Sequence, residues 1–203
     1  MPYKYKNILN IQGSDGSVRE ALLQIMDEKL GVGSIDFNKI TPMPRWAKCG
    51  SEGMREQWCR ENWTVPENAG GLEASVKGYD GGDTIEFDTV GGNVHDLMQK
   101  LSVMFPDSPD LAFDYLWASE DVGKDGGMMQ FTHGELTYEY IPEADSQEAY
   151  ELAFDIFSTD AAEHGLVFDS GTGTYCHKSK LSMPLDDTDD EYPGIDYGDY
   201  YEE

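Results

Sequence analysis

The feature that most constrains the fold of this chain is a strand–helix–strand pattern that occurs near its start and returns later. In the first copy, residues 7–12 alternate apolar and polar side chains, which predicts a strand. Residues 18–29 repeat apolar side chains at helical spacing, and Ser17 and Glu20 have the spacing of a capping box, so a helix is predicted to begin near Ser17. A second strand is expected at residues 34–41, which a proline-rich stretch ends.

The second copy follows an insertion at residues 45–80. Residues 84–89 predict a strand, a helix is expected to begin near Asn93, and residues 111–119 predict a strand rich in aromatic side chains. Two split βαβ units in this order build an α+β, ferredoxin-like sandwich with a mostly antiparallel sheet, and right-handed crossovers place both helices on one of its faces. We expect the core to include Leu22, Ile25, Leu97, Leu101, Phe113 and Tyr115.

A C-terminal hairpin-helix extension follows the second copy. Residues 127–132 and 135–141 predict a β-hairpin. A third helix is expected near Ser146, where Asp145 and Glu148 have capping-box spacing, and a short strand-like segment comes after it. We therefore divide the chain into a domain at residues 1–141, which contains the insertion, a helix and strand extension packed on it at 142–185, and an acidic, Tyr-rich tail at 186–203.

The charge of the chain restricts its partners. Forty Asp and Glu against 14 Lys and Arg leave a net charge of −26, so neither direct nucleic acid binding nor an anionic membrane surface is expected. A basic protein is the natural partner for such a field, although acidity can also serve solubility alone. The candidate partner-binding residues are acids on the third helix and in the tail, Glu148, Glu151, Asp155, Asp189, Asp190 and Glu191.

The sequence contains no recognised motif for catalysis or for a cofactor. No nucleophile elbow, phosphate-binding loop or regular calcium loop occurs, so we expect neither an enzyme nor a cofactor. A zinc site from Cys49, Cys59, Cys176 and His177 would lack the short Cys-x-x-Cys hook, and idle reduced thiols are the simpler interpretation, so no metal is expected.

One segment of the insertion is a candidate pocket. Trp58, Glu61, Asn62 and Trp63 combine a carboxylate, a carboxamide and aromatic walls, which suit a small ligand or a metal-dependent hydrolase. The alternative is structural: the indoles cover the sheet while Asn62 satisfies buried backbone. We favour the structural role.

No apolar stretch in the sequence has the length of a signal peptide core or of a membrane span. Together with three sparse cysteines, this leads us to expect the reducing cytoplasm of a host cell.

Several short segments resemble a known family. They are Asn7-Ile8-Leu9, residues 35–40 with Pro42-Met43-Pro44, Glu61-Asn62-Trp63, Leu101-Ser102, Phe105-Pro106 and residues 117–123. Together they resemble the YubB-type ferredoxin-like domain family of phages and plasmids over about residues 3–140. The resemblance implies a ferredoxin-like architecture without iron–sulfur chemistry, and it carries no biochemical role. The chain departs from the family after Trp63, where it reads Thr64-Val65-Pro66-Glu67.

These observations lead to one functional expectation with an alternative. We expect a non-enzymatic accessory protein of a phage or other mobile element. Its acidic surface would imitate nucleic acid and occupy a basic groove of a host defence nuclease complex, as an anti-restriction or anti-CRISPR protein would. The alternative is the hydrolase or small-ligand-binding domain that uses the region of Glu61, Asn62 and Trp63.

Overall fold

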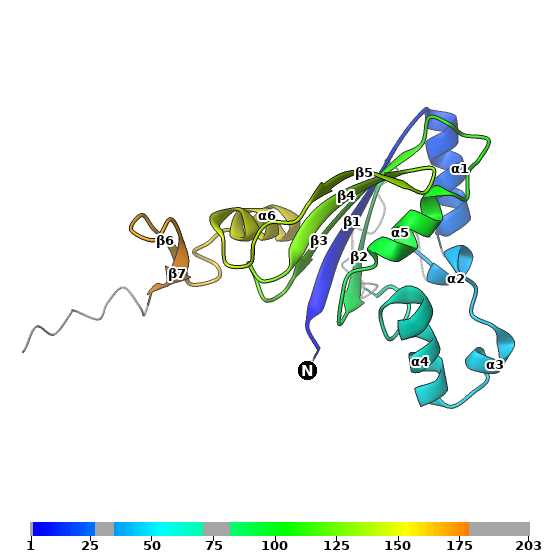
Figure 1. Ribbon diagram of the computed structural model, residues 1–203, viewed down its shortest axis with the longest axis horizontal. Coiled ribbons are helices and arrows are strands. Elements are labelled where there is room, and N and C mark those ends of the chain that lie inside the picture. Colours follow the sequence, from blue (N-terminus) through cyan, green and yellow to red (C-terminus); the bar gives the residue numbers. More distant parts are fainter. Residues whose placement is uncertain (1, 27–34, 71–81, 179–203) are drawn as a thin grey trace, which may run out of the picture.

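The computed structural model describes residues 2–26, 35–70 and 82–178, and a five-stranded antiparallel sheet forms its centre (Figure 1). The strands lie in the order β2-β1-β3-β4-β5. Their bounds are Lys4–Gln12 (β1), Thr84–Val90 (β2), Ala112–Ser119 (β3), Gly126–Thr132 (β4) and Glu135–Tyr140 (β5). The fold is therefore α+β with an antiparallel sheet, as the sequence predicts.

The second strand–helix–strand copy forms the predicted split unit. β2 and β3 both pair antiparallel with β1, so they run parallel to each other with β1 between them. Ile8 of β1 lies opposite Glu86 on one side and Leu116 on the other. Helix α5 (His95–Ser102) connects the two outer strands and packs on β3 and β4.

The first copy departs from the prediction, because the strand expected at residues 34–41 is wrong. Helix α1 (Asp15–Ile25) ends before the predicted Lys29, and Met26 forms an isolated antiparallel bridge with Ile35. The chain then turns into the short helix α2 (Phe37–Ile40).

Local capping and tertiary packing together explain this helix. The Asp36 carboxylate accepts a hydrogen bond from the backbone N–H of Asn38, which caps the first turn of α2. Phe37 is fully buried, with its ring centroid 5.7 Å from that of Trp63 and 5.9 Å from that of Phe87. Its aromatic contacts come from distant parts of the chain, so residue alternation could not reveal them.

Both predicted capping boxes are also misplaced. The N-cap of α1 is Ser14, and the Ser17 hydroxyl instead donates to Asp110 at 3.0 Å. Helix α6 (Gln147–Phe157) has Ser146 as its N-cap, and the Ser146 hydroxyl accepts the N–H of Ala149. The helix positions were correctly predicted, because apolar spacing locates a helix better than it locates the cap.

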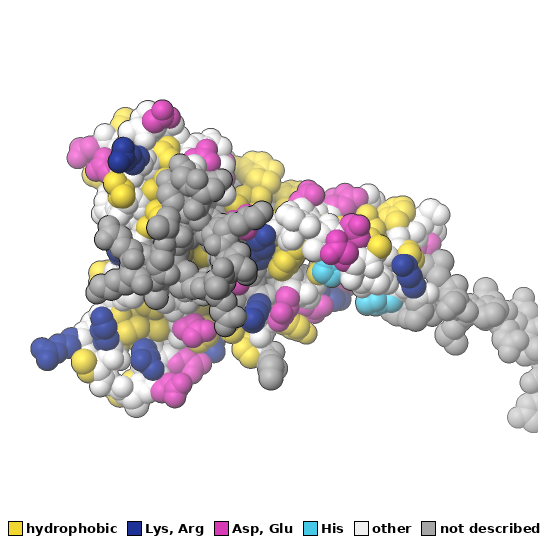
Figure 2. All heavy atoms as spheres, turned by 180° about the vertical axis from the view of Figure 1, so that it is seen from behind, with side chains coloured by type: hydrophobic (Ala, Val, Ile, Leu, Met, Phe, Trp, Pro, Cys, Tyr) yellow, Lys and Arg dark blue, Asp and Glu magenta, His cyan; other side chains and the backbone are white. Residues whose placement is uncertain are grey.

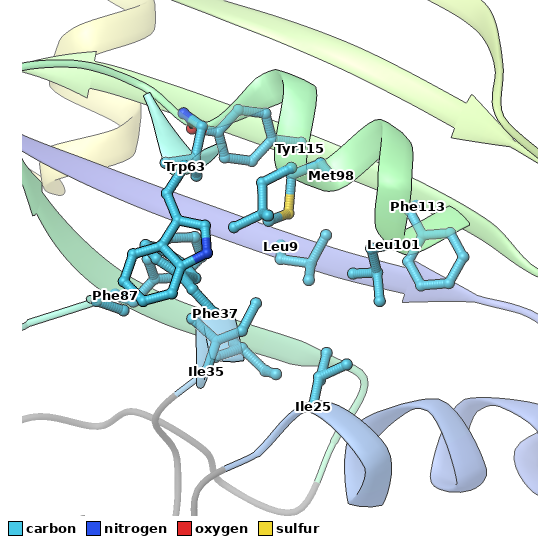
Figure 3. Close-up of a cluster of buried hydrophobic side chains, with 14 of the residues drawn as sticks. Leu9, Ile25, Ile35, Phe37, Trp63, Phe87, Met98, Leu101, Phe113 and Tyr115 are labelled. Carbon is cyan, nitrogen blue, oxygen red and sulfur yellow. Dashed lines mark hydrogen bonds between the residues drawn. The ribbon is translucent and has the colours of Figure 1, made fainter. Parts of the chain in front are cut away.

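One face of the sheet holds the main core beneath α1, α2 and α5 (Figure 3). Every core residue predicted from the sequence is buried, with at most 3% of its surface exposed: Leu22, Ile25, Leu97, Leu101, Phe113 and Tyr115. The Tyr115 hydroxyl is satisfied there, since it donates to Asn7 Oδ1 at 2.6 Å and accepts from the Val94 N–H at 2.9 Å.

The opposite face of the sheet is covered in part by α6. Ala153 and Ile156 of this helix pack with Ala118 of β3, and the half-buried Ile8 and Leu116 complete the cluster. A small hairpin of β6 (Leu166–Asp169) and β7 (Thr174–His177) lies next to α6, so these elements form one end of the molecule (Figure 1).

The insertion contributes two further helices at the other side of the molecule (Figure 1). Helix α4 (Glu52–Trp63) matches the short helix indicated by the sequence, whereas the single turn α3 (Arg45–Lys48) is too brief to show a period. None of the helices in the described ranges is both long and apolar enough to cross a bilayer.

Candidate functional site at the acidic end of the molecule

The acidic residues are concentrated in the part of the chain that forms the end around α6. Residues 143–178, which include α6 and the β6–β7 hairpin, contain eight carboxylates and one lysine, Lys178, and the loop after β3 adds Glu120, Asp121 and Asp125 beside Lys124. Residues 35–70 contain five carboxylates and five cations, so they are neutral as a whole. The charge therefore divides the molecule into an acidic end and a neutral end.

Helix α6 presents three of the predicted partner-binding acids to solvent. Glu148, Glu151 and Asp155 are exposed, while Ala149 and Ala153 of the same helix are buried against the sheet. The three acids are separated by three and four residues, so they follow one face of the helix.

A hollow of about 450 Å³ lies beside α6. The loop after β3, the helix and the β6–β7 hairpin all contribute to its wall, which contains Glu120, Asp121, Asp145, Tyr150, His164 and Tyr175. Its lining also includes Lys124, which pairs with Asp145, and His177. The remaining acids and rings suit a cationic side chain, because carboxylates pair with the charge and rings contact its faces.

Close contacts hold the loop and the helix together at this hollow. Gly123 has a φ of +82°, and a Cβ at this position would lie only 2.6 Å from Cε1 of Tyr150. Asp145 donates its N–H to the Gly123 carbonyl at 2.8 Å, and its carboxylate lies 2.7 Å from Lys124 Nζ. The loop therefore needs glycine here, and the wall of the hollow is built from fixed contacts.

Neighbouring groups shift the pKa values of two side chains in the wall, Tyr150 and Lys124. Burial raises the pKa of the Tyr150 hydroxyl, and the Asp145 carboxylate adds to this effect. Asp145 also raises the pKa of Lys124 by accepting its hydrogen bond. Asp121 is half-buried, and its carboxylate accepts no hydrogen bond and forms no ion pair within the part of the chain that the structure describes. This carboxylate is therefore the one best placed to receive a cation from outside.

Two acids on the open face of the sheet do not extend the acidic surface. Glu86 forms an ion pair with Lys6 at 3.1 Å. Burial raises the pKa of Asp88, while Lys4 and Lys6 counter that effect. Cations of β1 thus balance the charge of these strand acids.

The candidate pocket in the insertion does not form as one site. Trp63 is buried, and its indole N–H donates to the Thr41 carbonyl at 3.0 Å. The Asn62 carboxamide donates to the Trp58 carbonyl of its own helix at 2.9 Å, whereas Glu61 is exposed and accepts from Gln57. Glu61 and Trp63 line different hollows, so the structure favours the structural role.

The remaining predicted groups do not converge either. Cys49 is exposed, Cys59 is buried and Cys176 is half-buried. Within residues 2–26, 35–70 and 82–178, no group of three or more His, Cys, Asp or Glu side chains has an arrangement that could hold a metal ion. Asp189, Asp190 and Glu191 lie outside the described residues.

Sequence reasoning did not identify the hollow itself. Asp121, Tyr150 and Tyr175 come from three separate elements, and none belongs to a motif. The one available signal was the composition of the C-terminal half, which is rich in carboxylates and tyrosines and contains few cations.

The fold and this surface define a ferredoxin-like α+β protein with one strongly acidic end. In a comparison with protein families, residues 71–160 match the family described as "Ferredoxin-like domain in Api92-like protein". This region spans β2 to α6, so it includes β2, α5 and β3 of the split unit but not β1, which lies between the two strands. Neither the curated proteins nor the solved structures contain a match. The wider resemblance to YubB-type proteins of phages and plasmids stays a prediction.

Proposed function

We propose that this protein is a non-enzymatic accessory protein of a phage or other mobile element. In this proposal its acidic end imitates nucleic acid and binds a basic groove of a host defence nuclease complex in the cytoplasm. The observation that carries the proposal is the concentration of carboxylates around α6, with three exposed acids in a row on the helix and an acidic hollow beside them.

The spacing of the helix acids supports the imitation of a nucleic acid strand. A rise of about 1.5 Å per residue separates Glu148, Glu151 and Asp155 by roughly 4.5 and 6 Å along the helix axis. One strand of DNA carries a charge about every 3.4 Å along its axis. The helix therefore offers a row of negative charges whose density is comparable to that of one DNA strand. The lysines and arginines of a phosphate-binding groove could pair with this row.

The hollow adds a place for one cationic side chain. A lysine or arginine that enters it would approach Asp121 and contact the rings of Tyr150 and Tyr175. Such a contact favours a protein partner over a simple counter-ion, because an extended side chain can reach both the carboxylate and the rings.

A competition experiment tests the proposal. Immobilised protein is used to capture partners from a host lysate at about 0.15 M salt, and each basic partner is then purified. Duplex DNA should displace the protein from the true partner, the affinity should fall steeply as salt rises, and the protein should inhibit the partner's nuclease activity. Binding that DNA leaves unchanged would reject nucleic acid mimicry.

Charge-reversed variants locate the surface. The triple variant Glu148→Lys, Glu151→Lys and Asp155→Lys should bind the partner at least tenfold more weakly and fold normally, since exposed charges contribute little to stability. The matched control carries Glu20→Lys, Glu61→Lys and Glu67→Lys, which are also exposed and change the net charge equally. Equal weakening by both variants would mean that only the net charge matters.

A further inference from the structure

An exposed tryptophan lies among several cations on the insertion, although residues 35–70 are neutral as a whole. Five of the 14 cations of the chain fall within residues 39–60. Figure 2 shows dark blue Lys and Arg side chains gathered at the corner that α3 and α4 form. We define the α3–α4 patch as the exposed Arg45, Trp46, Lys48, Met54 and Arg55, among which the exposed Glu52 also lies.

Trp46 is the unusual member of this patch. Its exposed fraction is 59%, whereas Trp58, Trp63 and Trp117 are at most 8% exposed. The α3 turn does not need this indole for its own packing, because the neighbouring Ala47 is fully buried and anchors the turn. Large exposed indoles are enriched at binding surfaces, where they supply contact area with few rotatable bonds.

Tight packing holds the turn in place. A Cβ at Gly50 would lie 2.9 Å from the Trp46 carbonyl oxygen and 3.4 Å from Met54 Cβ. The N–H of Cys49 also donates to the Arg45 carbonyl at 2.9 Å. The backbone that carries the indole is therefore fixed against the start of α4.

The cations of the patch are available to a ligand. Across the described ranges, Arg45, Lys48 and Arg55 form no ion pair, while Arg60 pairs with Glu56 at 2.8 Å. Lys48 and Arg55 line one hollow of about 740 Å³, together with the Arg60–Glu56 ion pair and with Glu52 and Glu67. Arg45, Lys48 and Arg55 thus face solvent on a surface that they share with the exposed Glu52.

The acidic end does not cancel this local charge. The α3–α4 corner and the α6 end lie at opposite sides of the molecule along its long axis (Figure 1). Exposed charges further apart than the Debye length, about 8 Å at physiological salt, are largely screened from each other. A ligand at the patch therefore interacts mainly with the cations beside it.

We propose that the α3–α4 patch binds single-stranded nucleic acid. Phosphates would pair with Arg45, Lys48 and Arg55, and a base would stack on the Trp46 indole, as positive grooves with aromatic platforms bind single strands. The exposed indole favours this ligand over an acidic peptide, which needs the cations but no stacking surface. The net charge led us to expect no nucleic acid contact, because phosphate binding needs clustered cations, and the patch brings Arg45, Lys48 and Arg55 together on α3 and the start of α4.

Tryptophan fluorescence tests the proposal at a single site. A dT oligonucleotide is titrated into the full chain at about 0.05–0.15 M salt, and it should quench the emission of the exposed Trp46 while the three buried indoles stay bright. In fluorescence anisotropy with a labelled oligonucleotide, Trp46→Ala should weaken binding roughly tenfold, and Trp46→Phe should restore part of the loss.

Charge variants complete the test. The double variant Lys48→Glu and Arg55→Glu should weaken binding by more than tenfold. The control with Arg19→Glu and Lys178→Glu changes the net charge equally on other elements and should bind within about twofold of the parent. Circular dichroism checks that each variant is folded.

Four results would overturn the proposal. They are the absence of quenching, equal weakening by the control variant, equal binding of poly-glutamate, which would identify an acidic protein as the ligand, and self-association through the patch in sedimentation experiments. None of these results depends on the acidic end, so this test is independent of the proposed function.

Discussion

Replacing Tyr115 by Phe tests whether the buried hydrogen bonds of this core contribute to its stability. The ring of Tyr115 is fully buried, and its hydroxyl donates to Asn7 Oδ1 at 2.6 Å while it accepts from the Val94 N–H at 2.9 Å. Tyr115→Phe keeps the shape of the ring and removes both bonds. Asn7 cannot turn away, since its Nδ2 donates to Thr89 Oγ1 at 3.0 Å and to the Phe87 carbonyl at 3.2 Å.

The expected loss follows from the two groups that remain unpaired. A buried polar group without a partner costs about 1–3 kcal/mol, so we expect the two unpaired groups left by Tyr115→Phe to lower the free energy of unfolding by about 2–6 kcal/mol. Equilibrium urea unfolding should show a lower midpoint at an unchanged slope. Tyr138→Phe, at a side chain that is 49% exposed, is the control and should stay within about 0.5 kcal/mol of the parent.

A second variant separates the hydrogen bonds from other effects of the substitution. Combining Tyr115→Phe with Asn7→Val removes both partners of one bond, so the double loss should be smaller than the sum of the single losses. A loss below about 0.5 kcal/mol for Tyr115→Phe alone would refute the reasoning.

Three further predictions concern the core, the titration of the sheet and the loop at the acidic hollow. Leu97→Ala should lower the free energy of unfolding by about 2–5 kcal/mol in urea, because the side chain is fully buried. A loss below about 0.5 kcal/mol would mean that this face of α5 does not pack on the sheet. Burial and Asp125 raise the pKa of the Tyr5 hydroxyl to about 12. The protonated hydroxyl therefore stabilises the fold fully below pH ~10, and this contribution is lost as the pH rises towards 12. Tyr5→Phe should make the free energy of unfolding fall less steeply over this pH range, and an equally steep fall would contradict the prediction. Gly123→Ala should cost more than about 1 kcal/mol, and less when Tyr150→Ala removes the ring, whereas equal costs in both backgrounds would mean that the contact is unimportant.

Two opposite surfaces on one small protein have a functional consequence. The acidic end around α6 suits a basic protein, and the α3–α4 patch suits a phosphate-bearing strand, so the two proposals describe separate contacts. A protein with both could engage a nucleic-acid-binding partner and a strand beside it at the same time. Variants of each surface can be tested separately because the two surfaces lie on different elements.

The sequence alone determined most of the architecture. Apolar periodicity located α1, α5 and α6, and alternation located the five strands of the sheet, because these patterns follow directly from the geometry of an element with one buried face. The row of Glu148, Glu151 and Asp155 on the exposed side of α6 could be predicted for the same reason.

Only the tertiary structure decided the features that depend on distant residues. Phe37 lies in a helical turn and not in a strand, because Trp63 and Phe87 surround its ring. The acidic hollow requires three elements that are separate in the chain. The candidate pocket at Glu61 and Trp63, for which the sequence favoured a structural role, does not form, because these two helix positions line different hollows. The net charge belongs to the whole sequence, but binding depends on local charge, and folding places the acids of the loop after β3 beside α6 and the β6–β7 hairpin.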